Sequence, residues 1–258
     1  MPMTELQELE RRVTKRFRRA LADYQLTNDG DHILVAVSGG KDSLCLLELM
    51  ARQARIHRPA IRVEAVHVRM SNISYATSTD YLERFCHELD VPLHLLTTSF
   101  DTGEDVQLTE GTSQAQARHK QKTPCFLCSW QRRKQIFNLA QQLGCNKIAL
   151  GHHMDDIIHT TLMNQFFQGR FEGMPVRLRM KKMPLTIIRP LCLQHEADLK
   201  ALAEMKQYEK QVKNCPYEQD THRQFVAELF NRIEQTNPEA RFSIWRALER
   251  EGRLTEDE

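Results

Sequence analysis

The amino-acid sequence predicts an α/β protein built on an open, mainly parallel five-stranded sheet with helices on both faces. Two observations support this prediction. Short runs rich in Val, Ile and Leu alternate with segments whose apolar residues recur every three or four positions, the rhythm of strand and crossover helix. At 258 residues the chain is also long enough for one such domain with additional helices at both ends.

Residues 1–28 are predicted to form a basic amphipathic helix that ends near the turn residues Asn28 to Asp31. Its apolar stripe consists of Leu6, Leu9, Val13, Phe17, Leu21 and Tyr24. Its polar side carries a first basic cluster, made of Arg11, Arg12, Lys15, Arg16, Arg18 and Arg19. The stripe requires a partner, so we expect this helix to dock on the domain that follows.

Residues 29–192 are predicted to form the α/β domain, and residues 193–258 a C-terminal helical part. Strands are expected at 32–37, 62–68, 92–97, 147–150 and 186–188. Helices are expected at 43–54, 79–89, 129–143, 155–168, 195–208, 219–235 and 240–249. The polar segment Ser99 to Thr123 is predicted to be a long loop, and the last residues, 255–258, are predicted to fray.

A glycine pair, a lysine, an aspartate and two serines, in the order Ser38-Gly39-Gly40-Lys41-Asp42-Ser43, follow the first strand and open the next helix. Free backbone N–H groups and the positive end of a helix meet at such a junction, which favours binding of an anion. The segment is too short for a Walker A loop. The alternative is a turn that only connects strand and helix.

A second polar segment, Gly151-His152-His153-Met154-Asp155-Asp156, follows another predicted strand. Open α/β sheets bind ligands at the carboxyl ends of their strands, so this segment and the first are expected to face one crevice, with His67 lining it. Asp155 and Asp156 would complement Asp42 as oxygen ligands for Mg²⁺. The alternative is that both aspartates only stabilise a helix N-terminus.

The seven cysteines fall into two groups. Cys125 and Cys128 lie two residues apart before a predicted helix, where thiolates suit redox chemistry or metal binding. Cys215, in a polar loop, is the best candidate for a third ligand, and three thiolates on a [4Fe-4S] cluster would leave one iron open. The remaining four are expected to be small core residues, namely Cys45, Cys86, Cys145 and Cys192.

The net charge is only +2, but the positive residues are clustered, which favours RNA as a partner over the alternative of solvated helix faces. The other two clusters comprise Arg118, Lys120, Lys122, Arg132, Arg133 and Lys134, and Arg177, Arg179, Lys181, Lys182 and Arg189.

No apolar run approaches the ~20 residues of a membrane span. Since the first ten residues contain no apolar block like that of a signal peptide, a cytoplasmic protein is expected.

Taken together, these residues resemble the tRNA 2-thiocytidine synthetase family of PP-loop ATP pyrophosphatases over nearly the whole chain. The resemblance is carried by 38–43, Cys125-x-x-Cys128 followed by Arg132-Arg133, 150–156, 173–175, 188–191 and Cys215. It implies the PP-loop, or adenine nucleotide alpha hydrolase-like, fold. Lysidine synthetases share the first glycine-rich motif and the His-His-x-Asp-Asp motif, whereas the three cysteines separate this family from them.

The resemblance implies ATP- and iron–sulfur-dependent tRNA thiolation, in which the C2 oxygen of cytidine 32 is adenylated and replaced by sulfur. It implies that Ser38, Gly39, Gly40, Asp42 and Ser43 hold the pyrophosphate, and that Gly151, His152 and Asp156 complete the nucleotide site. Lys41 would neutralise charge, Asp42 with Asp155 would organise Mg²⁺, and Arg132 would contact phosphate or RNA. Cys125, Cys128 and Cys215 would hold a [4Fe-4S] cluster, with sulfide or a cysteine desulfurase as sulfur donor.

The sequence departs from the family pattern in two places. Cys215 is followed by Pro216-Tyr217-Glu218, where the family has a second cysteine, and Ser129-Trp130-Gln131 stands in place of Ser-Arg-Leu. Three alternatives stay open: thiolation of another base to give 2-thiouridine, cluster-free thiolation through persulfide chemistry on Cys128 and Cys215, and a non-catalytic, nucleotide-sensing RNA-binding protein. Whether the chain forms a homodimer is likewise undecided.

Overall fold

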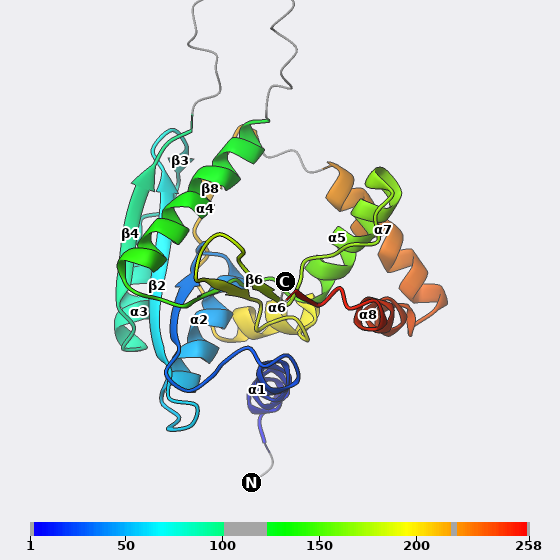
Figure 1. Cartoon of the computed structure of the whole chain (residues 1–258), viewed down its shortest axis with the longest axis horizontal. Coiled ribbons are helices and arrows are strands. Elements are labelled where there is room, and N and C mark those ends of the chain that lie inside the picture. Colours follow the sequence, from blue (N-terminus) through cyan, green and yellow to red (C-terminus); the bar gives the residue numbers. More distant parts are fainter. Residues whose placement is uncertain (1–2, 101–122, 218–220, 257–258) are drawn as a thin grey trace, which may run out of the picture.

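The computed structural model describes residues 3–100, 123–217 and 221–256, and it contains a seven-stranded, mainly parallel sheet (Figure 1). The strand order is β4-β2-β1-β5-β7-β6-β9. The strands are β1 (His32–Ala36), β2 (Arg62–Met70), β4 (Leu93–Thr98), β5 (Lys147–Ala149), β6 (Arg177–Arg179), β7 (Thr186–Ile188) and β9 (Thr255–Glu256). All five predicted strands are present, and the α/β class with a mainly parallel sheet is confirmed.

Helices cover both faces of the sheet, as predicted. The helices are α1 (Glu5–Asp23), α2 (Lys41–Ala54), α3 (Asp80–Glu88), α4 (Pro124–Gln142), α5 (Met154–Gln168), α6 (Glu196–Met205), α7 (Thr221–Thr236) and α8 (Ala240–Arg250). Successive side chains of β1 point to opposite faces of the sheet. Ile33 and Val35 join the core on the α2 side, while Leu34 joins the core beneath α4. Among the described helices, none has the length and apolar character needed to cross a bilayer.

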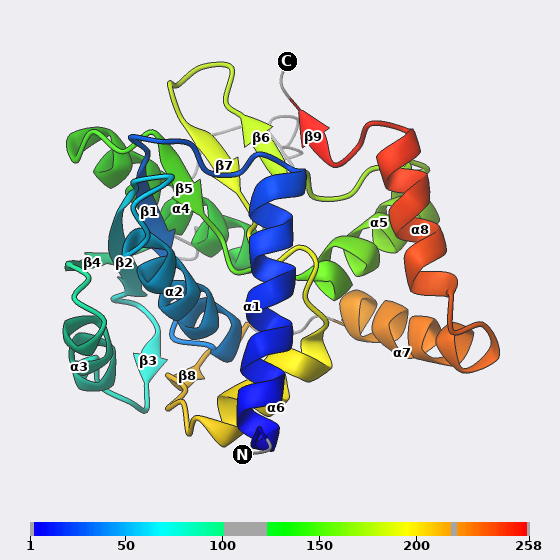
Figure 2. The same cartoon turned by 90° about the horizontal axis from the view of Figure 1, so that it is seen from below.

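The N-terminal helix α1 docks as its pattern predicts. Leu9, Val13 and Phe17 are buried in the main core, and Figure 2 shows α1 running alongside α6. Arg12 and Arg16 both bind Asp198 of α6. For these two arginines of the first basic cluster, the structure therefore supports a role in helix packing.

The structure differs from the prediction at the start of α4, at β9 and in three further strands. Helix α4 begins at Pro124 instead of Ser129, because Thr123 caps it by accepting a hydrogen bond from the Phe126 N–H at 3.3 Å. The expected fraying is wrong for β9, which pairs with β6. A small sheet of β3 (Ser74–Tyr75) and β8 (Lys213–Asn214), and the strand β6, were not predicted. Most of the predicted 99–123 loop lies outside the described residues.

Candidate functional site

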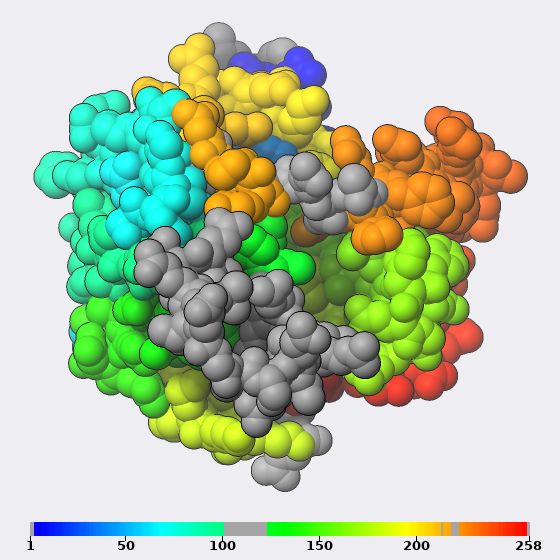
Figure 3. Space-filling model, turned by 90° about the horizontal axis from the view of Figure 1, so that it is seen from above, coloured from blue at the N-terminus to red at the C-terminus, as the bar shows by residue number. Residues whose placement is uncertain are grey.

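A cavity of about 480 Å³ lies at the carboxyl ends of β1, β2 and β5. Its lining combines the two polar segments singled out in the sequence with residues of α4, α7 and the segment after α6. The lining residues are Ala36, Val37, Ser38, Gly40, Asp42, Ser43, Val66, His67, Val68, Tyr75, Arg132, Ile136, Leu150, Gly151, His152, Asp156, Gln211 and Arg223. Figure 3 looks onto this end of the molecule, with α5 and α7 on one side and the sheet and α4 on the other.

The loop between β1 and α2 is preorganised by its two serines. The Ser43 hydroxyl donates to the Gly40 carbonyl at 2.9 Å and accepts from the Ser38 N–H at 3.2 Å. Gly40 is the N-cap of α2 and supplies no side chain to cap it. The first N–H groups of α2 are therefore not capped by a side chain, an arrangement that suits a bound anion.

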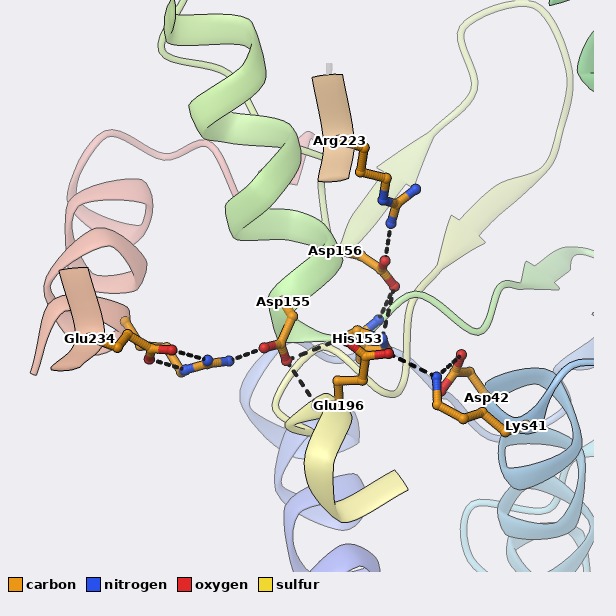
Figure 4. Close-up of polar contacts among 9 residues, drawn as sticks. Lys41, Asp42, His153, Asp155, Asp156, Glu196, Arg223 and Glu234 are labelled. Carbon is orange, nitrogen blue, oxygen red and sulfur yellow. Dashed lines mark hydrogen bonds and ion pairs between the residues drawn. The ribbon is translucent and has the colours of Figure 1, made fainter. Parts of the chain in front are cut away.

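Lys41 lies beside the cavity between two carboxylates, at 3.1 Å from both Asp42 Oδ2 and Glu196 Oε1 (Figure 4). Burial alone would lower the pKa of Lys41, but these carboxylates raise it above its ordinary value. The ammonium group is therefore charged at neutral pH. Both chain neighbours of Lys41, Gly40 and Asp42, line the cavity.

Unpaired polar atoms concentrate around this cavity. Within the described part of the chain, six buried side-chain nitrogen or oxygen atoms have no hydrogen-bond partner, and four of them belong to cavity-lining residues. These four are Asp42 Oδ1, His67 Nε2, Arg132 Nε and Gln211 Nε2. Because a buried polar atom without a partner is costly, this grouping indicates a polar ligand that satisfies them when bound.

His152 and Asp156 are held in the cavity wall by arginines. Burial, followed by the nearby Arg189 guanidinium, lowers the pKa of His152 to about 4. Arg189 Nε donates to His152 Nδ1 at 3.2 Å, so the neutral ring carries its proton on Nε2. Asp156 accepts from the His153 N–H at 3.0 Å and forms an ion pair with Arg223 of α7.

Asp155 does not line the cavity, and its carboxylate lies in a buried ion-pair network (Figure 4). Its carboxylate binds Arg241 of α8 and accepts the Glu196 N–H at 2.9 Å, and Arg241 also binds Glu234 of α7 at 2.6 Å. Burial alone would raise the pKa of Asp155, but His153 and Arg241 bring it well below its usual range. In this structure Asp155 therefore joins α5 to α6 and α8, and its predicted part in Mg²⁺ binding has no geometric support.

The cysteines divide as predicted. Cys45, Cys86, Cys145 and Cys192 are buried, whereas Cys125 is exposed and Cys128 and Cys215 are partly exposed. Burial raises the pKa of the Cys86 and Cys145 thiols to about 11, which makes them poor nucleophiles at neutral pH.

The three accessible cysteines meet at one end of α4. Cys128 and Cys215 both pack against the cluster of Met70, Ile73 and Phe100, and Cys125 Sγ donates to the Tyr217 carbonyl at 3.1 Å. Among residues whose placement is described, no three His, Cys, Asp or Glu side chains are close enough to hold a metal ion. The donor chemistry fits an iron–sulfur cluster, and the three thiols converge on one region without forming a closed ligand set.

Most of the predicted site residues come together in the cavity wall. Those lining it are Ser38, Gly40, Asp42, Ser43, His67, Arg132, Gly151, His152 and Asp156. Gly39, Lys41 and Asp155 lie outside the lining. Sequence reasoning missed Gln211 and Arg223, both of which lie far along the chain from the two motifs. The only signal near Gln211 was Cys215, four residues further on.

A family model described as a PP-loop domain matches residues 9–233. Curated relatives named tRNA-cytidine(32) 2-sulfurtransferase include that of Shewanella oneidensis, 32% identical over 95% of this chain and 76% of the relative. Those of Bordetella avium and Pseudomonas syringae pv. tomato are 35% and 33% identical, each over 94% of this chain and over 74% and 84% of their own lengths.

A solved structure supports the fold independently. The chain is similar to the U34-tRNA thiolase NcsA from Methanococcus maripaludis, which was solved with its [4Fe-4S] cluster. The TM-score is 0.71 at 22% identity, and the match covers 94% of this chain and 78% of that protein. At this identity the likeness establishes a shared fold.

Proposed function

The chain belongs to the PP-loop domain family and, within it, to the tRNA-cytidine(32) 2-sulfurtransferases, and from this premise we propose that it thiolates tRNA at the expense of ATP. The substrate position is cytidine 32, and the product is 2-thiocytidine. One observation carries the proposal: helix α4 links a cavity with unpaired polar atoms to two of the three accessible thiols, and the third, Cys215, lies beside the start of this helix. Cys125 and Cys128 begin the helix, and Arg132, one turn further, lines the cavity.

The cavity residues suit activation of a pyrimidine by ATP. The C2 oxygen of the base attacks the α-phosphorus, and pyrophosphate leaves with the bonding electrons. The serines and the uncapped start of α2 bind the pyrophosphate, while Lys41 and Arg132 stabilise the charge that develops on it. Sulfide then attacks C2, and the C2–O bond breaks to release AMP, which is a far better leaving group than the original oxygen.

Two inorganic groups are part of the proposal. Asp42 would hold Mg²⁺ together with the phosphates, because its Oδ1 is buried in the cavity wall without a partner. Cys125, Cys128 and Cys215 would hold a [4Fe-4S] cluster, which supplies an open iron able to carry sulfide. Sulfide or a cysteine desulfurase is the proposed sulfur source.

Exposed basic residues give the tRNA a surface on which to bind. Arg11, Lys15 and Arg18 line a groove on α1, and Lys181 and Lys182 lie exposed between β6 and β7. Contacts of such residues with RNA phosphates would be weakened by salt. We place the reaction in the cytoplasm, where ATP and tRNA are both present.

Nucleoside mass spectrometry of bulk tRNA tests the proposal. Cells that lack the protein are expected to lose 2-thiocytidine and to regain it when the gene is restored. Loss of 2-thiouridine instead would reassign the base, and unchanged 2-thiocytidine would refute the proposal.

Iron content of protein purified without oxygen separates the cluster mechanism from persulfide chemistry. AMP release separates both mechanisms from a non-catalytic RNA-binding protein.

Replacing Gly151 with alanine is expected to weaken ATP binding at least about tenfold, because small displacements of a positioning loop have large effects. An added Cβ would lie 3.2 Å from the Ser43 nitrogen and 3.3 Å from the Asp42 carbonyl, both backbone atoms at the start of α2. Isothermal titration calorimetry measures the change. Gly144→Ala is the control, because nothing lies within 4 Å of its added Cβ. Its φ of +69° nevertheless makes alanine strained at this position. The control should lose stability and keep its ATP affinity.

A further inference from the structure

The segment of residues 211–217, here called the strap, connects the loop after β1 to the region of the accessible cysteines. At one end the Gln211 N–H donates to the Gly39 carbonyl at 3.0 Å. At the other end Cys215 and Tyr217 pack on the Phe100 cluster, with the Tyr217 and Phe100 rings 6.2 Å apart. In Figure 3 the strap, in orange, lies next to the cyan segment that contains β3.

Gln211 lies directly against the phosphate loop. A Cβ added to Gly39 would lie 2.6 Å from the Gln211 Cβ, and Gly39 has a φ of +83°. Glycine is therefore required at position 39 both by its backbone conformation and by the close approach of Gln211.

The Gln211 side chain is unpaired where it meets the cavity. Gln211 lines the cavity, and its Nε2 is buried without a hydrogen-bond partner. An amide N–H₂ group is a donor only, so the partner it lacks is an acceptor. Phosphate oxygens of a nucleotide held by the neighbouring loop are acceptors of the required kind.

Two short contacts make the strap a continuous connection. The Val212 N–H donates to Thr77 Oγ1 at 2.9 Å, and β8 pairs with β3 so that Lys213 lies opposite Tyr75. In the cavity wall, Arg132 Nη2 of α4 in turn donates to the Tyr75 hydroxyl at 3.3 Å. Because Cys215 directly follows β8, Gln211 and Cys215 belong to one short segment that is hydrogen-bonded to its neighbours between them.

We propose that Gln211 donates a hydrogen bond to a phosphate group of the bound nucleoside triphosphate and that the strap thereby ties the position of Cys215 to nucleotide binding. The inference rests on the proposed function in taking ATP as the ligand of the cavity. It makes the sulfur-handling region responsive to whether the activating substrate is present.

Binding of a non-hydrolysable ATP analogue, with a methylene group between the α- and β-phosphorus atoms, tests the first part. Gln211→Ala is expected to bind the analogue about tenfold more weakly, the usual effect of losing one hydrogen bond to a charged group. Gln211→Glu keeps the shape but replaces the donor with a negative charge, so it should bind at least as weakly. Val212→Ala, an exposed neighbour outside the cavity lining, should bind like the wild type.

Hydrogen–deuterium exchange of peptides covering 211–217 tests the second part. In the wild type and in Val212→Ala, saturating analogue should slow amide exchange in the strap, whereas in Gln211→Ala saturating analogue should leave it unchanged. Wild-type affinity in both Gln211 variants, or no effect of the analogue on the wild-type strap, would overturn the inference while ATP-dependent thiolation could still be measured. A Gln211-dependent response without any tRNA thiolation would overturn the proposed function alone.

Discussion

Replacing Cys215 with alanine is expected to abolish sulfur transfer to tRNA while ATP affinity changes by less than about twofold, or about 0.4 kcal/mol. The thiol is a proposed cluster ligand, and it does not line the nucleotide cavity. Loss of a direct ligand should exceed the roughly 10–100-fold effect that loss of an outer partner has on metal sites. Formation of 2-thiocytidine in purified tRNA, with ATP and sulfide supplied, measures the activity.

Cys145→Ala provides a matched control, because Cys145 is buried in the core beneath α4 and its thiol pKa is raised to about 11. This variant should keep its iron, its visible absorption and its activity. Cys125→Ala and Cys128→Ala should behave like Cys215→Ala. If Cys215→Ala retained both iron and thiolation, the third ligand would have to be sought elsewhere.

The nucleotide loop could be predicted because its signals are local. A buried strand, a glycine pair and an amphipathic helix occur within about twenty residues, and the structure joins them as expected. The division of the seven cysteines was predictable for the same reason, since the apolar or polar character of the immediate neighbours decides burial. Helix α4 also carried a readable signal, Thr123 before Pro124, but its first turn lacks the apolar periodicity that guided the prediction.

Gln211 and Arg223 could not be predicted, because the only marked residue near them, Cys215, indicated metal binding and not the nucleotide cavity. Each reaches the cavity from a segment more than fifty residues beyond the second polar segment, which ends at Asp156, and glutamine and arginine are ordinary surface residues. Strands β6 and β9 are likewise short, at three and two residues, and they lack the apolar run that marks the equally short β5 and β7; β6 is defined by its pairing with β7 and β9. Tertiary contacts alone define such elements.

Asp155 and Asp156 show how adjacent identical residues acquire different roles. Successive residues of a helix point about 100° apart, so one carboxylate lines the cavity while the other faces Arg241. The sequence contains no local feature that decides which of the two does which. The assignment of Asp155 to Mg²⁺ stays a prediction, whereas its contacts with Arg241 and Glu196 support a structural role that can be measured.

Replacing Asp155 with asparagine is expected to lower the free energy of unfolding by about 3–5 kcal/mol at pH 7, because it leaves the buried Arg241 charge without one of its two carboxylates. For a chain of this size the melting temperature should fall by roughly 6–20 °C. Denaturation in urea, followed by circular dichroism, measures the difference. Asp156→Asn, one residue away, should change stability by less than about 1 kcal/mol and chiefly impair ATP turnover.

The effect of Asp155→Asn should also depend on pH with a defined sign. The folded-state pKa of Asp155 lies below its usual range, so its carboxylate contributes fully above the unfolded value of about 3.9 and loses its contribution as pH falls through the folded value. The stability difference between wild type and Asp155→Asn should therefore be largest near neutral pH and should shrink below about pH 4. If Asp155→Asn kept wild-type stability but lost Mg²⁺-dependent ATP turnover, Asp155 would be a metal ligand and not an ion-pair partner. Removal of a buried ion-pair partner lowers stability.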